Sequence, residues 1–104
     1  MIKHDFEYFV RRINNVENIS TLTALLDGAS GSEVLSHSQY AEVKDMITGK
    51  INSHRETFDT LQGLEANLYY MTECYPENAE LDEMHAKAKD LLIFWHDLTG
   101  CESN

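Results

Sequence analysis

Two pairs of carboxylates have a spacing with which a helix can hold a divalent cation. Glu80 and Glu83 are three residues apart, as are Glu56 and Asp59, and residues at this spacing share one face of a helix. Two such pairs on facing helices would bind Mg²⁺ for nucleotide hydrolysis. A straight helical hairpin, however, would place the second pair opposite the far end of the last helix. The simpler explanation of Glu80 and Glu83 is the favourable interaction of acids with a helix N-terminus.

Nucleophilic catalysis and transition-metal binding have equally little support. Cys74 follows Glu73 and is predicted to lie at the C-terminal end of a helix, and both features disfavour a reactive thiolate. His54 falls among apolar positions, which is typical of a core histidine rather than a metal ligand. Zinc, EF-hand, P-loop, dinucleotide-binding and nucleophile-elbow motifs are absent from the sequence. We therefore expect a protein that is not an enzyme and uses no metal or cofactor.

The distribution of charge is the most informative feature. Between Arg55 and Lys87 there are eight acidic residues and neither lysine nor arginine. Such a stretch either only keeps the protein solvated or docks a basic partner surface, such as a nucleic-acid-binding groove. Only one ring of the pair Tyr69 and Tyr70 can lie near the apolar seam, so we expect the other to anchor a partner. The predicted partner-binding residues are Glu56, Asp59, Glu65, Tyr70, Glu73, Glu77, Glu80, Asp82 and Glu83.

The composition predicts one acidic domain. The 104 residues, with a mass of 11.9 kDa and 42% hydrophobic content, suffice for a single core. A net charge of −10 and a pI near 4.7 disfavour direct binding of nucleic acid. No apolar run reaches the ~18 residues of a membrane helix. The beginning of the sequence does not read as a signal peptide, and two cysteines are too few for a disulfide scaffold. The expected localisation is cytoplasmic.

Apolar residues recur at helical spacing in four places, and alternating β-branched runs are absent. We expect the second helix to begin with Ser20 as its N-cap and to end at Gly28. The third is either one long helix or two helices that meet near Gly49, and we favour the break. Asn78 caps the last helix, and Gly100 ends it. The predicted helices cover residues 3–14, 20–27, 38–75 and 78–99.

The third helix carries a sustained seam with steps of three and four residues, as in a coiled coil. It consists of Tyr40, Val43, Ile47, Ile51, His54, Phe58, Leu61, Leu64, Leu68, Met71 and Tyr75. The stripe of the last helix is formed by Leu81, Met84, Ala88, Leu91, Trp95 and Leu98. Because the connection between these helices is short, they should pack antiparallel. The predicted fold is all-α: a small bundle of about four helices, in one domain over residues 1–104, with a long antiparallel C-terminal helical hairpin.

Five consecutive apolar residues, Leu91 to Trp95, cover more than one side of a helix. Either this helix is surrounded at the centre of the bundle, or Phe94 or Trp95 leads an apolar patch for self-association or partner binding. The preferred function is a small cytoplasmic protein-binding regulator, acting as an inhibitor, adaptor or nucleic-acid mimic. The alternatives are a homo-oligomeric structural bundle, such as a homodimer, and a carboxylate–Mg²⁺ nucleotide hydrolase.

Overall fold

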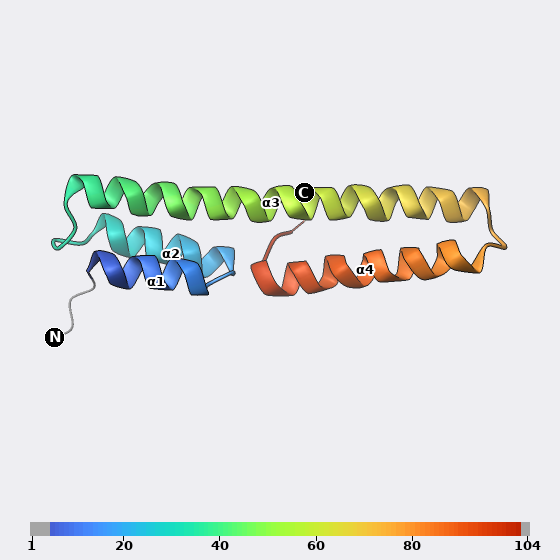
Figure 1. The fold of residues 1–104 in the computed structure, drawn as a ribbon, viewed down its shortest axis with the longest axis horizontal. Coiled ribbons are helices and arrows are strands. Elements are labelled where there is room, and N and C mark those ends of the chain that lie inside the picture. Colours follow the sequence, from blue (N-terminus) through green and yellow to red (C-terminus); the bar gives the residue numbers. More distant parts are fainter. Residues whose placement is uncertain (1–4, 103–104) are drawn as a thin grey trace. The chain divides into compact units, whose positions relative to one another are not determined.

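The computed structural model describes residues 5–102, in which there are four helices and no strand. The helices are α1 (Phe6–Asn15), α2 (Ile19–Ser30), α3 (His37–Cys74) and α4 (Ala79–Thr99) (Figure 1). This confirms the predicted all-α fold with about four helices and a long C-terminal hairpin.

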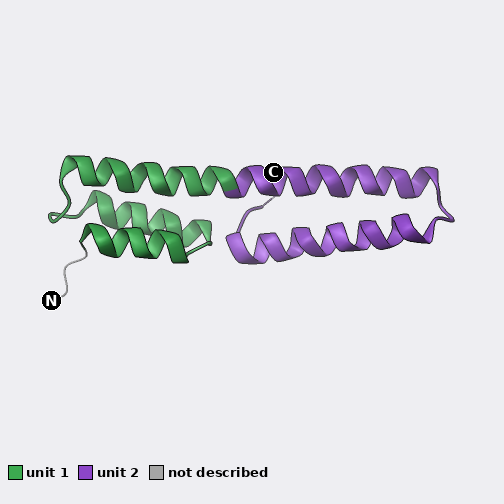
Figure 2. Cartoon of the chain, viewed as in Figure 1, with its two compact units in different colours: residues 1–53 green, residues 54–104 purple. Residues whose placement is uncertain are grey.

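The chain divides into two compact units, and the division falls within α3 (Figure 2). Unit 1 covers residues 1–53 and contains α1, α2 and the beginning of α3. Unit 2 covers residues 54–104 and consists of the rest of α3 packed against α4.

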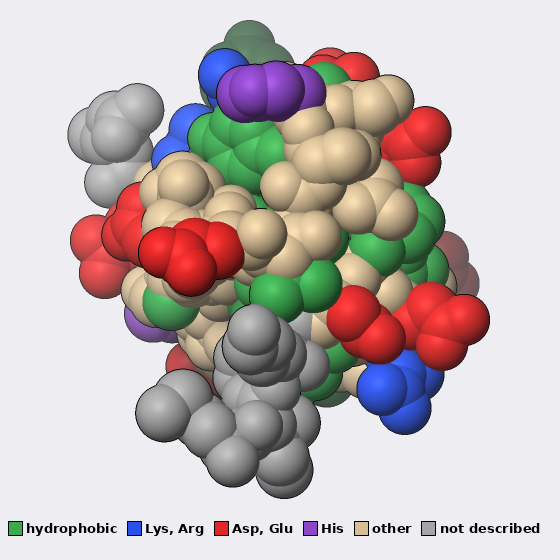
Figure 3. All heavy atoms as spheres, turned by 90° about the vertical axis from the view of Figure 1, so that its left-hand side faces the viewer, with side chains coloured by type: hydrophobic (Ala, Val, Ile, Leu, Met, Phe, Trp, Pro, Cys, Tyr) green, Lys and Arg blue, Asp and Glu red, His purple; other side chains and the backbone are tan. Residues whose placement is uncertain are grey.

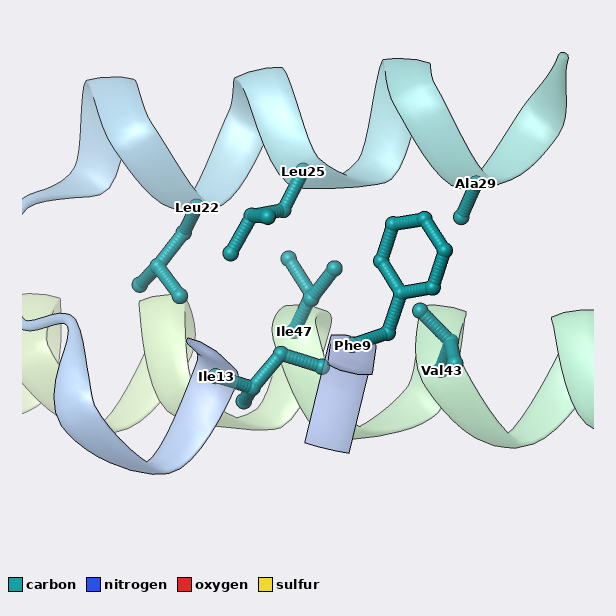
Figure 4. Packing of buried hydrophobic residues seen from close by; sticks show 7 residues of the cluster. All are labelled: Phe9, Ile13, Leu22, Leu25, Ala29, Val43 and Ile47. Carbon is teal, nitrogen blue, oxygen red and sulfur yellow. The ribbon is translucent and has the colours of Figure 1, made fainter. Parts of the chain in front are cut away.

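Unit 1 has an entirely apolar core between its three helical segments. Figure 4 shows the side chains of this core pointing toward one another from α1, α2 and α3. They belong to Phe9, Ile13, Leu22, Leu25, Ala29, Val43 and Ile47. Half-buried apolar side chains, such as those of Leu26 and Ile51, pack around it. Burial of this set provides most of the helical stability, because isolated helices as short as α1 and α2 are marginal in water.

A lysine of α3 adds a polar tie to this unit. The Lys50 ammonium donates a hydrogen bond of 2.5 Å to the carbonyl oxygen of Ile13 and lies 3.3 Å from Oε1 of Glu17. Ile13 is in the last turn of α1, where carbonyl groups lack partners within the helix and the helix dipole favours a cation. Lys50 therefore supports the C-terminal end of α1 from another helix.

Unit 2 is an antiparallel helical hairpin (Figure 1), and each of its two helices buries one line of residues. The reversal follows from local signals. Pro76 stands just beyond α3, and Oδ1 of Asn78 accepts a hydrogen bond of 3.1 Å from the backbone N–H of Leu81 at the start of α4. Gly100 ends α4 with φ of 75°, a left-handed conformation that favours glycine. The buried residues are His54, Phe58, Leu68, Leu81, Ala88, Thr99 and Cys101.

The break that we expect near Gly49 is not present, since α3 is continuous from His37 to Cys74. A glycine within a helix costs only about 1 kcal/mol relative to alanine. The seam passes through this position, with Ile47 buried just before it and Ile51 half-buried just after it. The packing of these residues outweighs the cost of the glycine.

The bounds of α2 also differ from the prediction. Asn18, not Ser20, is the N-cap, and its Oδ1 accepts hydrogen bonds from the backbone N–H groups of Ser20 at 2.9 Å and Thr21 at 3.4 Å. At the other end the helix continues through Gly28 to Ser30. The additional turn buries Ala29, which is 2% exposed, so core packing extends the helix past the glycine.

Candidate protein-docking surface

The predicted docking residues on α3 lie on the side that points away from α4. Glu56, Asp59, Tyr70 and Glu73 are all exposed, and the ring of Tyr70 is 70% exposed. Their spacings of 3, 11 and 3 residues are close to whole numbers of helical turns, so they form one row along the helix. Phe58 and the other buried residues face the opposite way. Because the apolar seam of α3 packs against α4, the acidic row on the opposite side of α3 is exposed to solvent.

The acids that follow the turn are exposed as well, namely those of Glu77, Glu80, Asp82 and Glu83. Glu80 and Asp82 are in the first turn of α4, where the helix dipole favours negative charge. Acids at these positions thus stabilise α4 and at the same time concentrate charge at the end of the hairpin. An open hollow of about 770 Å³ lies here, lined by residues 74–80.

Glu65 is placed differently from the other predicted docking residues. It is half-buried between the helices, and its Oε1 forms a hydrogen bond of 2.7 Å with Nε2 of His85. Tyr69 lies beside the same histidine, with ring centroids 5.7 Å apart. The structure therefore ties Glu65 to the inner side of the hairpin. Tyr69 contacts His85 but is itself 54% exposed, so both tyrosines reach the surface, contrary to the prediction that only one ring does so.

Little positive charge neutralises this surface. In residues 5–102, Glu83 is the one acid of the predicted set that pairs with a lysine or arginine, at 3.2 Å from Nζ of Lys87. Both side chains of that pair are about two-thirds or more exposed, so it contributes at most about 1 kcal/mol to stability. Around the beginning of α3, Figure 3 shows acidic side chains at separate places, some beside lysine or arginine.

The predicted self-association residues have different surroundings. Nε1 of Trp95 donates a hydrogen bond of 2.9 Å to the carbonyl oxygen of His54, and the two rings make a T-shaped contact with centroids 5.4 Å apart. Trp95 thus joins α4 to α3 within the chain. Phe94 and Ile93 are 59% and 60% exposed. The apolar run is therefore divided between the hairpin interior and the surface.

The structure exposes a further set of residues that the sequence pattern assigns to the core. Leu64 and Met71 of α3, and Met84, Leu91 and Leu98 of α4, have exposed fractions from 38% to 52%. The sequence pattern did indicate this exposure, because the apolar seam is wider than one partner helix can cover. The sequence pattern did not indicate how many helices pack together in unit 2.

The cysteines and the groups that could hold a metal ion complete the description of the side chains. Among the described residues, no group of three or more His, Cys, Asp or Glu side chains is arranged to hold a metal ion. Both cysteines are free thiols; Cys74 is exposed, and Cys101 is buried. Within the same part of the chain, no helix combines the length and apolarity needed to cross a membrane.

Comparisons with protein families, curated proteins and solved structures find no match to this chain. The distinguishing property of the candidate docking surface is a row of exposed acids on α3 that continues into the turn and the first turns of α4.

Proposed function

We propose that this chain is a small, non-enzymatic regulator that docks a basic surface of a partner protein. The observation that carries the proposal is the turn end of the hairpin, where five exposed acids and no lysine or arginine occur within residues 73–83. The docking surface is formed by Glu56, Asp59, Tyr70, Glu73, Glu77, Glu80, Asp82 and Glu83.

Electrostatics would act first on the rate of association. A surface of one sign attracts an oppositely charged partner over about a Debye length, ~8 Å at physiological ionic strength, and aligns it before contact. A basic groove that binds nucleic acid is a partner of this kind. By occupying it, the protein would compete with DNA or RNA and act as an inhibitor or nucleic-acid mimic.

Tyr70 would supply the apolar part of the contact. Its ring is exposed within the acidic row, and tyrosine is enriched in interface hot spots because a rigid ring buries a large area with little loss of conformational freedom. An aromatic anchor among carboxylates would bind a partner that presents lysine or arginine around an apolar spot.

The proposed compartment is the cytoplasm. Two free cysteines, one of them exposed, are consistent with a reducing environment, in which thiols persist.

The experiment is a pull-down with tagged protein from nuclease-treated lysate, washed at low and high salt and repeated with DNA as competitor. The test variant changes Glu80, Asp82 and Glu83 to lysine, and the matched control changes three exposed acids of unit 1 to lysine. The control residues are Glu33, Glu42 and Asp45. Both variants alter the net charge equally, so a difference between them reports the position of the charge.

We expect the wild-type and control proteins to retain a basic partner that salt and DNA release, and the test variant to lose it. Circular dichroism verifies that the variants stay helical, since lysine near the N-terminus of α4 opposes the helix dipole. Equal retention of the partner by both variants would show that the acidic surface serves solvation alone.

A further inference from the structure

One flank of the hairpin carries apolar side chains that nothing in the described chain covers. On α3, Leu64 is 45% exposed and Met71 is 40% exposed. Leu64 precedes the buried Leu68 by four residues, and Met71 follows it by three residues. They therefore lie on one side of the line along which α3 contacts α4.

The same relation holds on α4. Met84 precedes the buried Ala88 by four residues and is 52% exposed. Leu91 follows Ala88 by three residues and is 49% exposed. Leu98 follows seven residues after Leu91 and is 38% exposed. Phe94 borders this row. On each helix the exposed row is displaced from the buried line in the same direction around the helix axis. Because the two helices are antiparallel, this displacement places both rows on the same side of the hairpin. We call the rows together the apolar flank: Leu64, Met71, Met84, Leu91 and Leu98.

Charge is nearly absent from this flank. The residues beside its α3 row are polar but uncharged, including Thr60 and Asn67. Beside its α4 row lie Glu80 and Lys87, which have opposite signs. The remaining acids of the hairpin surface belong to other sides of the two helices, so the apolar flank is a neutral strip on a strongly negative chain.

We propose that the occupant of the apolar flank is a second copy of this chain, which would complete a four-helix arrangement from two hairpins. A twofold interface places each patch against itself, so two chains of net charge −10 can associate only through a surface without excess acid. The apolar flank is such a surface. On each helix its residues recur every seven positions, a spacing that suits packing against further helices.

The available area fits a dimer. The five residues of the apolar flank and Phe94 are each about half-exposed. With about 200 Å² for a large side chain, they would bury roughly 600 Å² per copy, against about 800 Å² per partner in a standard stable interface. Backbone and rim atoms would supply the remainder.

Sedimentation velocity of the full chain, over a range of concentrations, tests the inference. We expect a species of twice the 11.9 kDa chain mass that persists at high salt, because apolar contact is not screened. The test variant is Leu91→Lys, and the matched control is Ile93→Lys. Ile93 is an apolar residue of similar exposure on another side of α4.

Loss of the dimer in Leu91→Lys but not in Ile93→Lys would support the inference. Circular dichroism must show unchanged helicity; if Leu91→Lys unfolds, Met84→Lys takes its place. A wild-type chain that is monomeric at every concentration would overturn it and assign the apolar flank to a different partner. Equal dimerisation of both variants would also overturn it. This result does not decide the proposed acidic docking. High salt should abolish the docking of a basic partner but should leave the apolar dimer intact.

Discussion

Replacing Lys50 with methionine should destabilise unit 1 by about 2 kcal/mol. Methionine retains the apolar stem of the side chain but removes the ammonium, which donates to the Ile13 carbonyl at 2.5 Å. A hydrogen bond with a charged partner contributes about 1.5–3 kcal/mol, and the Lys50 side chain is only 19% exposed. The ion pair with Glu17 is more exposed, at 37% on the glutamate side, and adds about 0.2–1 kcal/mol.

Urea unfolding followed by circular dichroism measures this change. The matched control is Lys44→Met, the same substitution at an exposed position of the same helix, which should alter stability by no more than about 0.5 kcal/mol. Glu17→Gln removes the charge that faces Lys50 and should cost less than half as much as Lys50→Met. The single tryptophan lies in unit 2, so its fluorescence reports the hairpin separately. If Lys50→Met costs no more than Lys44→Met, the Lys50 ammonium does not stabilise the C-terminal end of α1.

Two further substitutions test the local signals of the helices. Asn78→Ala removes the side-chain oxygen that accepts from Leu81 and should cost about 1 kcal/mol, whereas Asn78→Asp retains the cap and should be nearly neutral or stabilising; equal losses in a thermal melt would contradict the capping role. Gly49→Ala should stabilise the protein by about 0.5–1 kcal/mol, because an added Cβ meets nothing within 4 Å and alanine favours the helix. A lower melting temperature for Gly49→Ala would mean that α3 needs a bend there.

Much of this fold could be predicted because its signals are local. The turn between α3 and α4 follows from Pro76 and the Asn78 cap, and the end of α4 follows from Gly100; each of these signals acts within a few residues. The exposure of acids such as Glu80 follows from the high free-energy cost of burying a charge. These features need no knowledge of distant contacts.

The continuity of α3 could not be predicted in this way. A local rule weighs Gly49 against its immediate neighbours and favours a break. The outcome depends on the packing of Ile47 with residues of α1 and α2 that lie far away in the sequence. Tertiary contact therefore decides where local propensity is nearly balanced.

The surroundings of single side chains were also beyond the sequence pattern. Glu65 belongs to the acidic stretch, yet it lies between the helices because His85, 20 residues further along, offers a hydrogen bond. Phe94 and Trp95 are equally apolar neighbours, and only the rotation of α4 determines that Trp95 reaches the His54 carbonyl. Such pairings become visible once the register of the two helices is known.

The two thiols of this chain offer a selective handle for spectroscopy. Cys74 is exposed at the end of α3, whereas Cys101 is buried, so a thiol-reactive dye should attach at one position without any mutation. That position borders the turn end of the docking surface, and Trp95, the only tryptophan, lies well along α4 within the same unit. A dye at Cys74 and the indole of Trp95 would form an energy-transfer pair, and partner binding at the turn would change the emission of the dye directly.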